Sequence, residues 1–234
     1  MRIIDFPKLM WVSDRTIRFA FNAEISQDSF LAVQHFHQFI SSQLGRNVIE
    51  IVPAYYTVTV YLKKRQPLDI ANLTYQWIQY QQSIGGDRPI SRELRIPVCY
   101  DEEFALDMER VIEHTNLSFE ELVAIHTSTP YSVYLIGFLP GFPYLGELDP
   151  RLHVPRLQTP RKLVTASSVG IGGHQTGIYP IDSPGGWNII GKTPCSLFDV
   201  SKDEPTLFQT GDRVTFYEIT KKEYFEILSN ETIT

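Results

Sequence analysis

Glycine and proline are concentrated in one stretch of this 234-residue chain, and that stretch most limits the folds the chain can adopt. Ten of the 14 glycines and eight of the 15 prolines lie between Gly137 and Pro194. Glycine permits positive φ angles and close backbone approach, whereas proline fixes φ and lacks an amide donor. Short β-forming runs, such as 133–136 and 213–219, alternate with these loops. The pattern predicts a barrel with stiff, shaped loops, where binding sites are usually built.

The first ninety residues follow a different pattern, in which strands alternate with helices. Strands are indicated by alternation of polar and apolar residues, and helices by apolar residues at three- and four-residue spacing between capping residues. The predicted elements are a strand (15–21), a helix from Ser26 to Gly45, a hairpin (48–52 and 57–62) and a helix from Asp69 to Gly85-Gly86.

Together with a strand-like run at 94–100, this order suggests a split-βαβ, ferredoxin-like layer. The turn-forming stretch 85–89 (Gly-Gly-Asp-Arg-Pro) is typical of a boundary between structural units. The sequence therefore predicts an α+β protein with a small N-terminal domain (1–88) and a β-rich second domain (89–234).

Two short helices are predicted at the start of the second domain, over 104–115 and 118–127, and Ser118 and Glu121 form a capping box before the second. A DNA-binding helix-turn-helix would require a basic second helix. Glutamates occupy both helices instead, so packing against the barrel is the preferred interpretation.

Composition excludes several classes of function. The net charge of −6 argues against a nucleic-acid partner, because phosphate binding requires a basic face. The two cysteines, Cys99 and Cys195, do not indicate a disulfide framework. Since neither a signal peptide nor a membrane-spanning run is recognisable, we expect a cytoplasmic protein without a membrane association.

Several motifs resemble the allophanate hydrolase subunit 1 family, which includes the B-type subunit of 5-oxoprolinase (PxpB) and the kinase inhibitor KipI. They occur in the family's order: Gly137-Phe-Leu-Pro-Gly-Phe-Pro-Tyr-Leu-Gly146, Ser168-Val-Gly-Ile171, Gln175-Thr-Gly-Ile-Tyr-Pro180, Ser183-Pro-Gly-Gly-Trp187 and Gly191-Lys-Thr-Pro194. The resemblance extends over about 94–217, whereas the first ninety residues match only in the order of elements.

The resemblance implies a cyclophilin-like β-barrel for the second domain and a larger partner of the subunit 2 (PxpC or KipA) type. In a 5-oxoprolinase, a third protein of the LamB/YcsF (PxpA) type would complete the complex and ATP would be its co-substrate. This chain itself is expected to bind neither a metal nor biotin.

Two segments depart from the family pattern, and each lacks a glycine that the family often has. This chain has Asp101-Glu-Glu-Phe104 in place of Gly-Gly-Glu-Phe, and Thr165-Ala-Ser-Ser168 in place of Pro-Ala-Gly-Ser. The changes bear on whether the local backbone is retained.

No familiar catalytic motif is present. His35 and His37 point to different faces of a helix, so they do not suggest a metal site, and no G-x-S-x-G elbow accompanies the cysteines. The run Gly170-Ile-Gly-Gly173 lacks a Walker lysine and a following helix. A bulge or tight barrel corner explains it better than a nucleotide site.

The candidate site residues lie on the stiff loops. We predict His174, Gln175 and Tyr179 as catalytic residues. Of these, His174 alone could move a proton near neutral pH, and an amide such as that of Gln175 can polarise the carbonyl of an amide or lactam. The predicted substrate contacts are Phe138, Phe142, Thr176, Trp187 and Asn188, although the large aromatics also suit a barrel core or a partner interface.

The sequence leaves one leading function, with alternatives. The leading function is that of an enzyme subunit that, with its partners, hydrolyses 5-oxoproline to glutamate at the expense of ATP. The alternative is a KipI-like inhibitor of a sporulation histidine kinase, or a carboxyltransferase-type subunit of a urea carboxylase or allophanate hydrolase system. A prolyl isomerase is suggested only by the barrel, and fold does not imply function.

Overall fold

The computed structural model describes residues 4–21, 26–84 and 91–231. The chain divides into two compact units, Met1–Ile90 and Ser91–Thr234. The predicted boundary stretch 85–89 lies outside the described residues.

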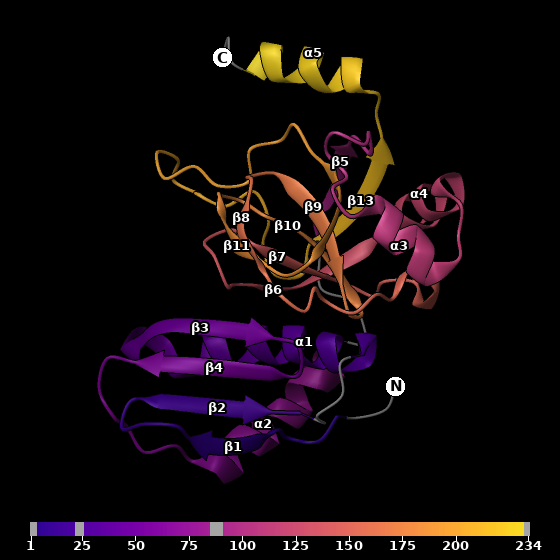
Figure 1. Ribbon diagram of the computed structural model, residues 1–234. Coiled ribbons are helices and arrows are strands. Elements are labelled where there is room, and N and C mark those ends of the chain that lie inside the picture. Colours follow the sequence, from indigo (N-terminus) through magenta and orange to yellow (C-terminus); the bar gives the residue numbers. More distant parts are fainter. Residues whose placement is uncertain (1–3, 22–25, 85–90, 232–234) are drawn as a thin grey trace. The chain divides into compact units, whose positions relative to one another are not determined.

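The first unit is a four-stranded antiparallel sheet with two helices on one face (Figure 1). The strands lie in the order β1-β2-β4-β3. The elements are β1 (Lys8–Trp11), β2 (Thr16–Ala20), α1 (Gln27–Leu44), β3 (Val48–Ala54), β4 (Thr57–Leu62) and α2 (Ile70–Ser83), with a 3₁₀ turn at Gly45–Asn47.

The helix starts of this unit agree with the sequence prediction. The Ser26 side chain accepts a hydrogen bond from the Ser29 amide, and Asp69 accepts one from Asn72. Each satisfies an amide that the first helical turn leaves without a partner. Phe36, Phe39 and Trp77 then pack against the inward-facing residues of β2 and β4.

The predicted ferredoxin-like arrangement is not confirmed. It required the strand at 94–100 to complete the first sheet, but β5 (Glu93–Val98) pairs in parallel with β13 of the second unit. The sequence prediction also missed β1, which pairs with β2 at this edge of the sheet. Local alternation marks a strand but does not specify its partner.

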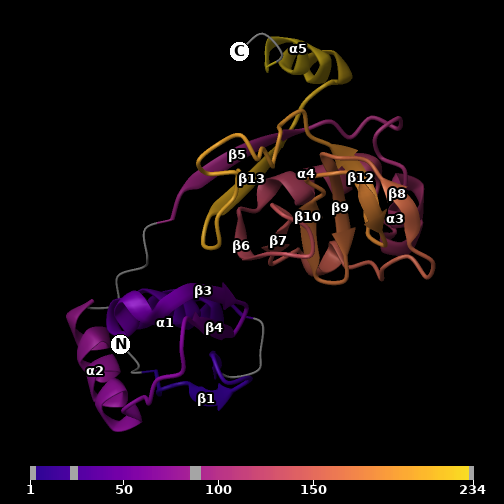
Figure 2. The ribbon, with the colours of Figure 1, turned by 90° about the vertical axis from the view of Figure 1, so that its left-hand side faces the viewer.

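The second unit is built around a nearly closed barrel, which the glycine and proline pattern predicted (Figure 2). Seven strands lie in the order β12-β9-β10-β7-β6-β13-β5, and the Cys99 and Lys192 backbones exchange two hydrogen bonds that join the two ends. The strands are β6 (Tyr131–Ile136), β7 (Pro143–Gly146), β9 (Ser168–Gly172), β10 (Gln175–Ile178), β12 (Asn188–Lys192) and β13 (Arg213–Glu218).

Smaller elements surround the barrel. They are α3 (Met108–Thr115), α4 (Phe119–Ser128), a 3₁₀ turn (Pro150–Leu152), a two-stranded sheet of β8 (Arg161–Val164) with β11 (Ser183–Gly185), and α5 (Lys221–Glu231). The predicted capping box at Ser118 and Glu121 is confirmed. Helix α3 begins four residues later than predicted, and α5 was not predicted.

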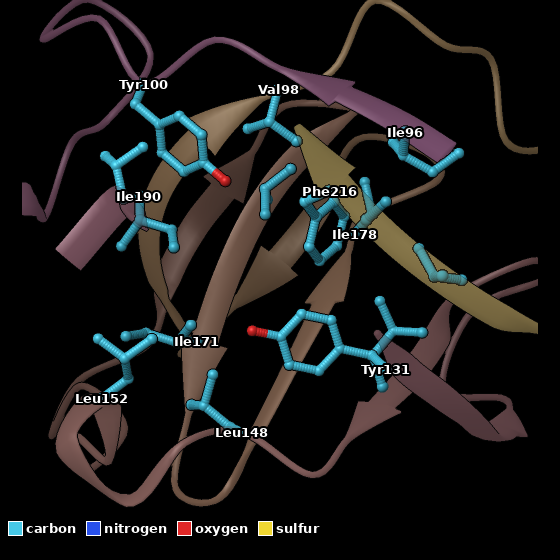
Figure 3. Packing of buried hydrophobic residues seen from close by; sticks show 14 of the residues in the cluster. Ile96, Val98, Tyr100, Tyr131, Leu148, Leu152, Ile171, Ile178, Ile190 and Phe216 are labelled. Atoms are coloured by element: carbon cyan, nitrogen blue, oxygen red, sulfur yellow. The ribbon is translucent and has the colours of Figure 1, made fainter. Parts of the chain in front are cut away.

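The barrel interior is apolar and tightly filled, as Figure 3 shows for Val98, Tyr131, Ile178 and Phe216. One histidine lies in this core with no exposed surface. His126 Nε2 is 2.9 Å from Thr176 Oγ1, which donates to the Gly170 carbonyl, and Nδ1 is 2.7 Å from the Tyr100 hydroxyl. His126 therefore donates through Nε2 and accepts at Nδ1, so its hydrogen bonding is complete in the neutral state.

Acid should unfold the barrel in part through His126. Burial lowers its pKa to about 3, whereas an unfolded histidine titrates near 6.5. Between these values the unfolded chain binds the additional proton, so stability falls as the pH drops, by up to about 1.4 kcal/mol per pH unit. Urea unfolding of the wild type and of His126→Gln from pH 7.5 to 4.5 measures this.

The His126→Gln profile should be flatter across that range, although the variant is less stable at pH 7.5. The exposed His114 on α3 supplies the control, because His114→Gln should follow the wild-type profile. Parallel profiles for all three proteins would contradict the assignment.

Candidate functional site

An aromatic cluster, consisting of Phe138, Phe142, Tyr144, Tyr179 and Trp187, covers the outer face of the barrel at β7 and β10. The Phe142 ring is at its centre, with ring centroids 4.9 Å from Tyr144, 5.2 Å from Tyr179 and 5.5 Å from Trp187. Edge-to-face contacts of this kind fix the rings relative to one another. The cluster is a second, smaller core outside the barrel.

Glycine makes room for Trp187 on this face of the sheet. Ile171 and Ile178 point into the barrel core, so the alternation of β9 and β10 turns Gly172 and Gly177 outward. A Cβ at Gly172 would lie 3.0 Å from the indole, and one at Gly177 would lie 2.7 Å from the Pro143 carbonyl oxygen and 3.1 Å from the indole. Gly172 therefore makes room for an aromatic ring, and Gly173, with a φ of 63°, lies in the tight turn from β9 to β10, which agrees with the predicted barrel corner.

Asn188 lies beneath this surface and holds two segments together. Its Oδ1 accepts from Arg110 Nε at 3.0 Å, and its Nδ2 donates to the carbonyls of Pro155 and Ile171. Its exposed fraction is 0%. Thr176 is equally buried and belongs to the His126 network. Both were predicted as substrate contacts; the structure places them beneath the surface, with their hydrogen bonds made inside the protein, and the substrate contact stays a prediction.

Tyr179 is also buried, in contrast to the prediction of a catalytic group. Burial raises the pKa of Tyr179, and a hydrogen bond to the Trp187 backbone offsets this in part. Its hydroxyl is protonated at neutral pH and its ring is packed in the aromatic cluster. Tyr179 therefore helps to shape the surface, and its catalytic role stays a prediction.

Phe138 is the exposed member of the aromatic cluster. Its ring is 63% exposed and contacts the edge of Phe142, with centroids 5.7 Å apart. Its φ of 68° is in the left-handed region, which is uncommon for a residue with a bulky side chain. Strain of this kind, together with an exposed aromatic ring, is typical of a binding loop.

His174 and His153 form a hydrogen-bonded pair at the β9–β10 turn, with their Nδ1 atoms 3.0 Å apart. His153 Nε2 is 2.9 Å from the Leu148 carbonyl oxygen, which can only accept, so this nitrogen carries a hydrogen. A neutral His153 therefore accepts at Nδ1, and His174 donates to it. This leaves the lone pair of a neutral His174 at Nε2, on an exposed side chain.

This arrangement suits proton transfer. Protonation of His174 at Nε2 adds a hydrogen on the free side of the ring and breaks neither hydrogen bond of the pair. A base whose tautomer is fixed in this way needs little rearrangement when it accepts a proton. His153, which the sequence reasoning did not select, is the residue that fixes it.

Gln175, the third predicted catalytic residue, follows directly after His174. It begins β10 opposite Gly172 and is half-buried. By alternation its side chain lies on the same face of β10 as Tyr179.

Charged residues that the sequence reasoning missed join the barrel to the loops around the site. Asp107 is buried and binds Arg161 through two hydrogen bonds of 2.6 and 2.8 Å, and it accepts a third from the Ile189 amide. Asp107 therefore ties β8 and β12 to the start of α3. No periodicity connects two residues 54 positions apart, so the local sequence gives no signal for this pair.

At the departure from the family pattern over 165–168, a serine takes a backbone conformation that favours glycine. Ser167 has a φ of 65°, which is the left-handed conformation that a glycine adopts most easily. Its hydroxyl donates to the Cys195 carbonyl, and its amide donates to the Tyr179 carbonyl. These hydrogen bonds help a serine hold this conformation.

Within the described ranges, no three His, Cys, Asp or Glu side chains gather where they could hold a metal ion. In the same ranges, no helix combines the length and the apolar character needed to span a membrane.

The chain belongs to the carboxyltransferase domain, subdomain C and D, family, whose match covers residues 7–208. The B subunit of the 5-oxoprolinase of Bacillus subtilis is 38% identical over 91% of this chain and 93% of its own length. The corresponding B subunit of Escherichia coli is 44% identical over 73% of this chain and 78% of its own length. A putative urea carboxylase of Emericella nidulans is 32% identical over 44% of this chain and 9% of its own.

Solved structures show the same fold. A conserved uncharacterized protein of Pyrococcus horikoshii, PH0987, is 36% identical with a TM-score of 0.56, and the match covers 93% of this chain and all of that protein. The protein TTHA0988 is 32% identical with a TM-score of 0.71, over 88% of this chain and 40% of its own. The urea amidolyase of K. lactis, at 20% identity and a TM-score of 0.72, covers 96% of this chain and 16% of its own length, and supports the fold alone.

The support of Trp187 by glycine can be tested with Gly177→Ala. Because the added methyl meets the Pro143 carbonyl and the indole, the variant should lose about 1–3 kcal/mol of unfolding free energy. Urea unfolding and near-ultraviolet circular dichroism measure the loss and the displacement of the ring.

Gly137→Ala is the matched control, because its methyl would meet only the Leu135 side chain, at 3.6 Å. The Gly137→Ala variant should lose little unfolding free energy. Equal stability of the Gly177→Ala variant and the wild type would show that the close approach is not needed.

Proposed function

We propose that this chain is the B subunit of an ATP-dependent 5-oxoprolinase, which converts 5-oxo-L-proline to L-glutamate together with A-type (PxpA) and C-type (PxpC) partner proteins. The exposed, tautomer-fixed His174 carries the proposal on the structural side. Similarity to 5-oxoprolinase B subunits over most of both chains supports it.

The chain contributes groups that a lactam needs but leaves them on an open surface. His174 accepts a proton from the water that attacks the lactam carbonyl, and the ring C–N bond then breaks to give the carboxylate and the amine of glutamate. The half-buried Tyr144 offers apolar contact to the ring. A surface of this kind leaves the substrate in water, where electrostatic stabilisation is weak. The partner proteins would cover it, and the ATP phosphates would bind mainly to them.

Reconstitution tests the proposal directly. Glutamate release from 5-oxo-L-proline with ATP should occur with this chain and its A-type and C-type partners together, and not when this chain is omitted. The absence of turnover with folded, assembled partners would remove the assignment.

Variants of the histidine pair test the site within that complex. His174→Gln should lower kcat about 10²- to 10⁴-fold, because general base catalysis contributes that much. His153→Gln should lower kcat less and shift the pH dependence of kcat, since His153 acts by fixing the His174 tautomer. His114→Gln, on the exposed surface of α3, is the control. Full activity of the His174→Gln complex would contradict the site.

A carboxyltransferase role is the second candidate, since the family is named for a carboxyltransferase domain and one relative is a putative urea carboxylase. It would require a separate biotin carrier. Avidin distinguishes the two functions, because it would block a biotin-dependent reaction and leave ATP-dependent glutamate release unchanged.

A further inference from the structure

Arg156 places a positive charge over the aromatic cluster. Its guanidinium carbon is 5.7 Å from the centroid of the Trp187 ring, and the side chain is exposed. Trp187 itself is only 5% exposed, because the other rings and the glycine face of the sheet surround it. The cation therefore lies on a rigid aromatic base.

The backbone on both sides of Arg156 is held in place. The Pro155 carbonyl accepts from Asn188 Nδ2 at 3.2 Å, and the Leu157 amide donates to the Gly186 carbonyl at 2.8 Å. These two partners, Asn188 and Gly186, are the chain neighbours of Trp187. The segment that carries the guanidinium is thus tied to the segment that carries the indole, which reduces the entropy lost when a ligand binds.

The charge of Arg156 has no carboxylate partner among the described residues. Over 4–21, 26–84 and 91–231, Arg156 takes part in no ion pair, whereas the nearby Arg161 is bound by Asp107. Burial raises the pKa of Tyr144 and of Tyr179, and the positive charge of Arg156 partly offsets this rise. The guanidinium is therefore close enough to act on both rings. An arginine held in this way offers a planar pair of donors to an anion.

We propose that Arg156 is the carboxylate anchor of the site, so that the chain selects a small lactam that carries a carboxylate. The carboxylate accepts from the guanidinium, and the apolar ring of the same molecule lies against the half-buried Tyr144, whose ring centroid is 5.9 Å from that of Trp187. The inference rests on the proposed function, because 5-oxoproline is a lactam with one carboxylate.

A binding measurement on the chain itself tests the anchor. The indole N–H resonance of Trp187 is followed by NMR while 5-oxo-L-proline or uncharged 2-pyrrolidinone is added. The carboxylate compound should shift this resonance with a dissociation constant at least tenfold lower than that of the uncharged one. Arg156→Met should abolish the difference, and Arg156→Lys should retain part of it.

Arg95→Met is the matched control. Arg95 is also exposed and lies 5.0 Å from the centre of an aromatic ring, that of Tyr217 on β13, outside the aromatic cluster. This variant should bind like the wild type. Equal affinity for the two compounds in the wild type, or an unchanged preference in Arg156→Met, would overturn the anchor.

Kinetics of the assembled complex separate the anchor from the proposed function. Arg156→Met should raise KM for 5-oxo-L-proline about 10- to 100-fold, the loss expected for a charge-assisted hydrogen bond, with a smaller change in kcat. If the complex is active and its KM does not change in Arg156→Met, Arg156 is not the anchor, and the proposed 5-oxoprolinase function still stands. If binding depends on Arg156 but the assembled complex shows no turnover, the role of Arg156 as the anchor stands and the 5-oxoprolinase function is wrong.

Discussion

The contact between the Trp187 indole and the bare outer face of β9 and β10 determines how the candidate site is built. Because Gly172 and Gly177 carry no side chains, the ring lies directly on the sheet and serves as a base for other groups. Phe142, Tyr144 and Tyr179 pack around it, and Arg156 lies above it. Asn188 follows Trp187 in the chain, and its side-chain amide donates to the Pro155 carbonyl beside Arg156 and to the Ile171 carbonyl in β9.

The structure separates two kinds of polar residue that look alike in sequence. Thr176 and Asn188 point inward, have no exposed surface and complete hydrogen-bond networks. Unpaired polar groups at those positions would each cost about 1–3 kcal/mol. His174 and Arg156 point outward and keep hydrogen-bonding capacity for a ligand. The buried residues hold the surface in shape, and the exposed residues carry its chemistry.

Local sequence signals predicted the local features of the fold. The caps at Ser26, Asp69 and Ser118 were correct, because each depends on residues within one helical turn. The strand at 94–100 was recognised but placed in the wrong sheet, since its partner β13 lies far away in the sequence. Pairing partners over such distances are decided by packing, which a local pattern does not contain.

The same limit applies to the site. The loops rich in glycine and proline pointed to His174, Phe142 and Trp187, which lie at or near the surface of interest. His153 and Arg156 were missed, because they reach the site only through the pairing of Val154 with Gly173 and the Asn188 contact. The burial of Thr176, Asn188 and Tyr179 is likewise a property of the packed barrel.

In the proposed complex, partner proteins would cover the open surface around His174. The reactivity of His174 toward diethyl pyrocarbonate, measured in the isolated chain and in the assembled complex, tests this most directly. His114, exposed on α3, serves as the internal reference. We predict that assembly protects His174 and leaves His114 reactive. If His174 in an assembled complex reacts as fast as in the isolated chain, the partners do not cover this surface and the shared site is wrong.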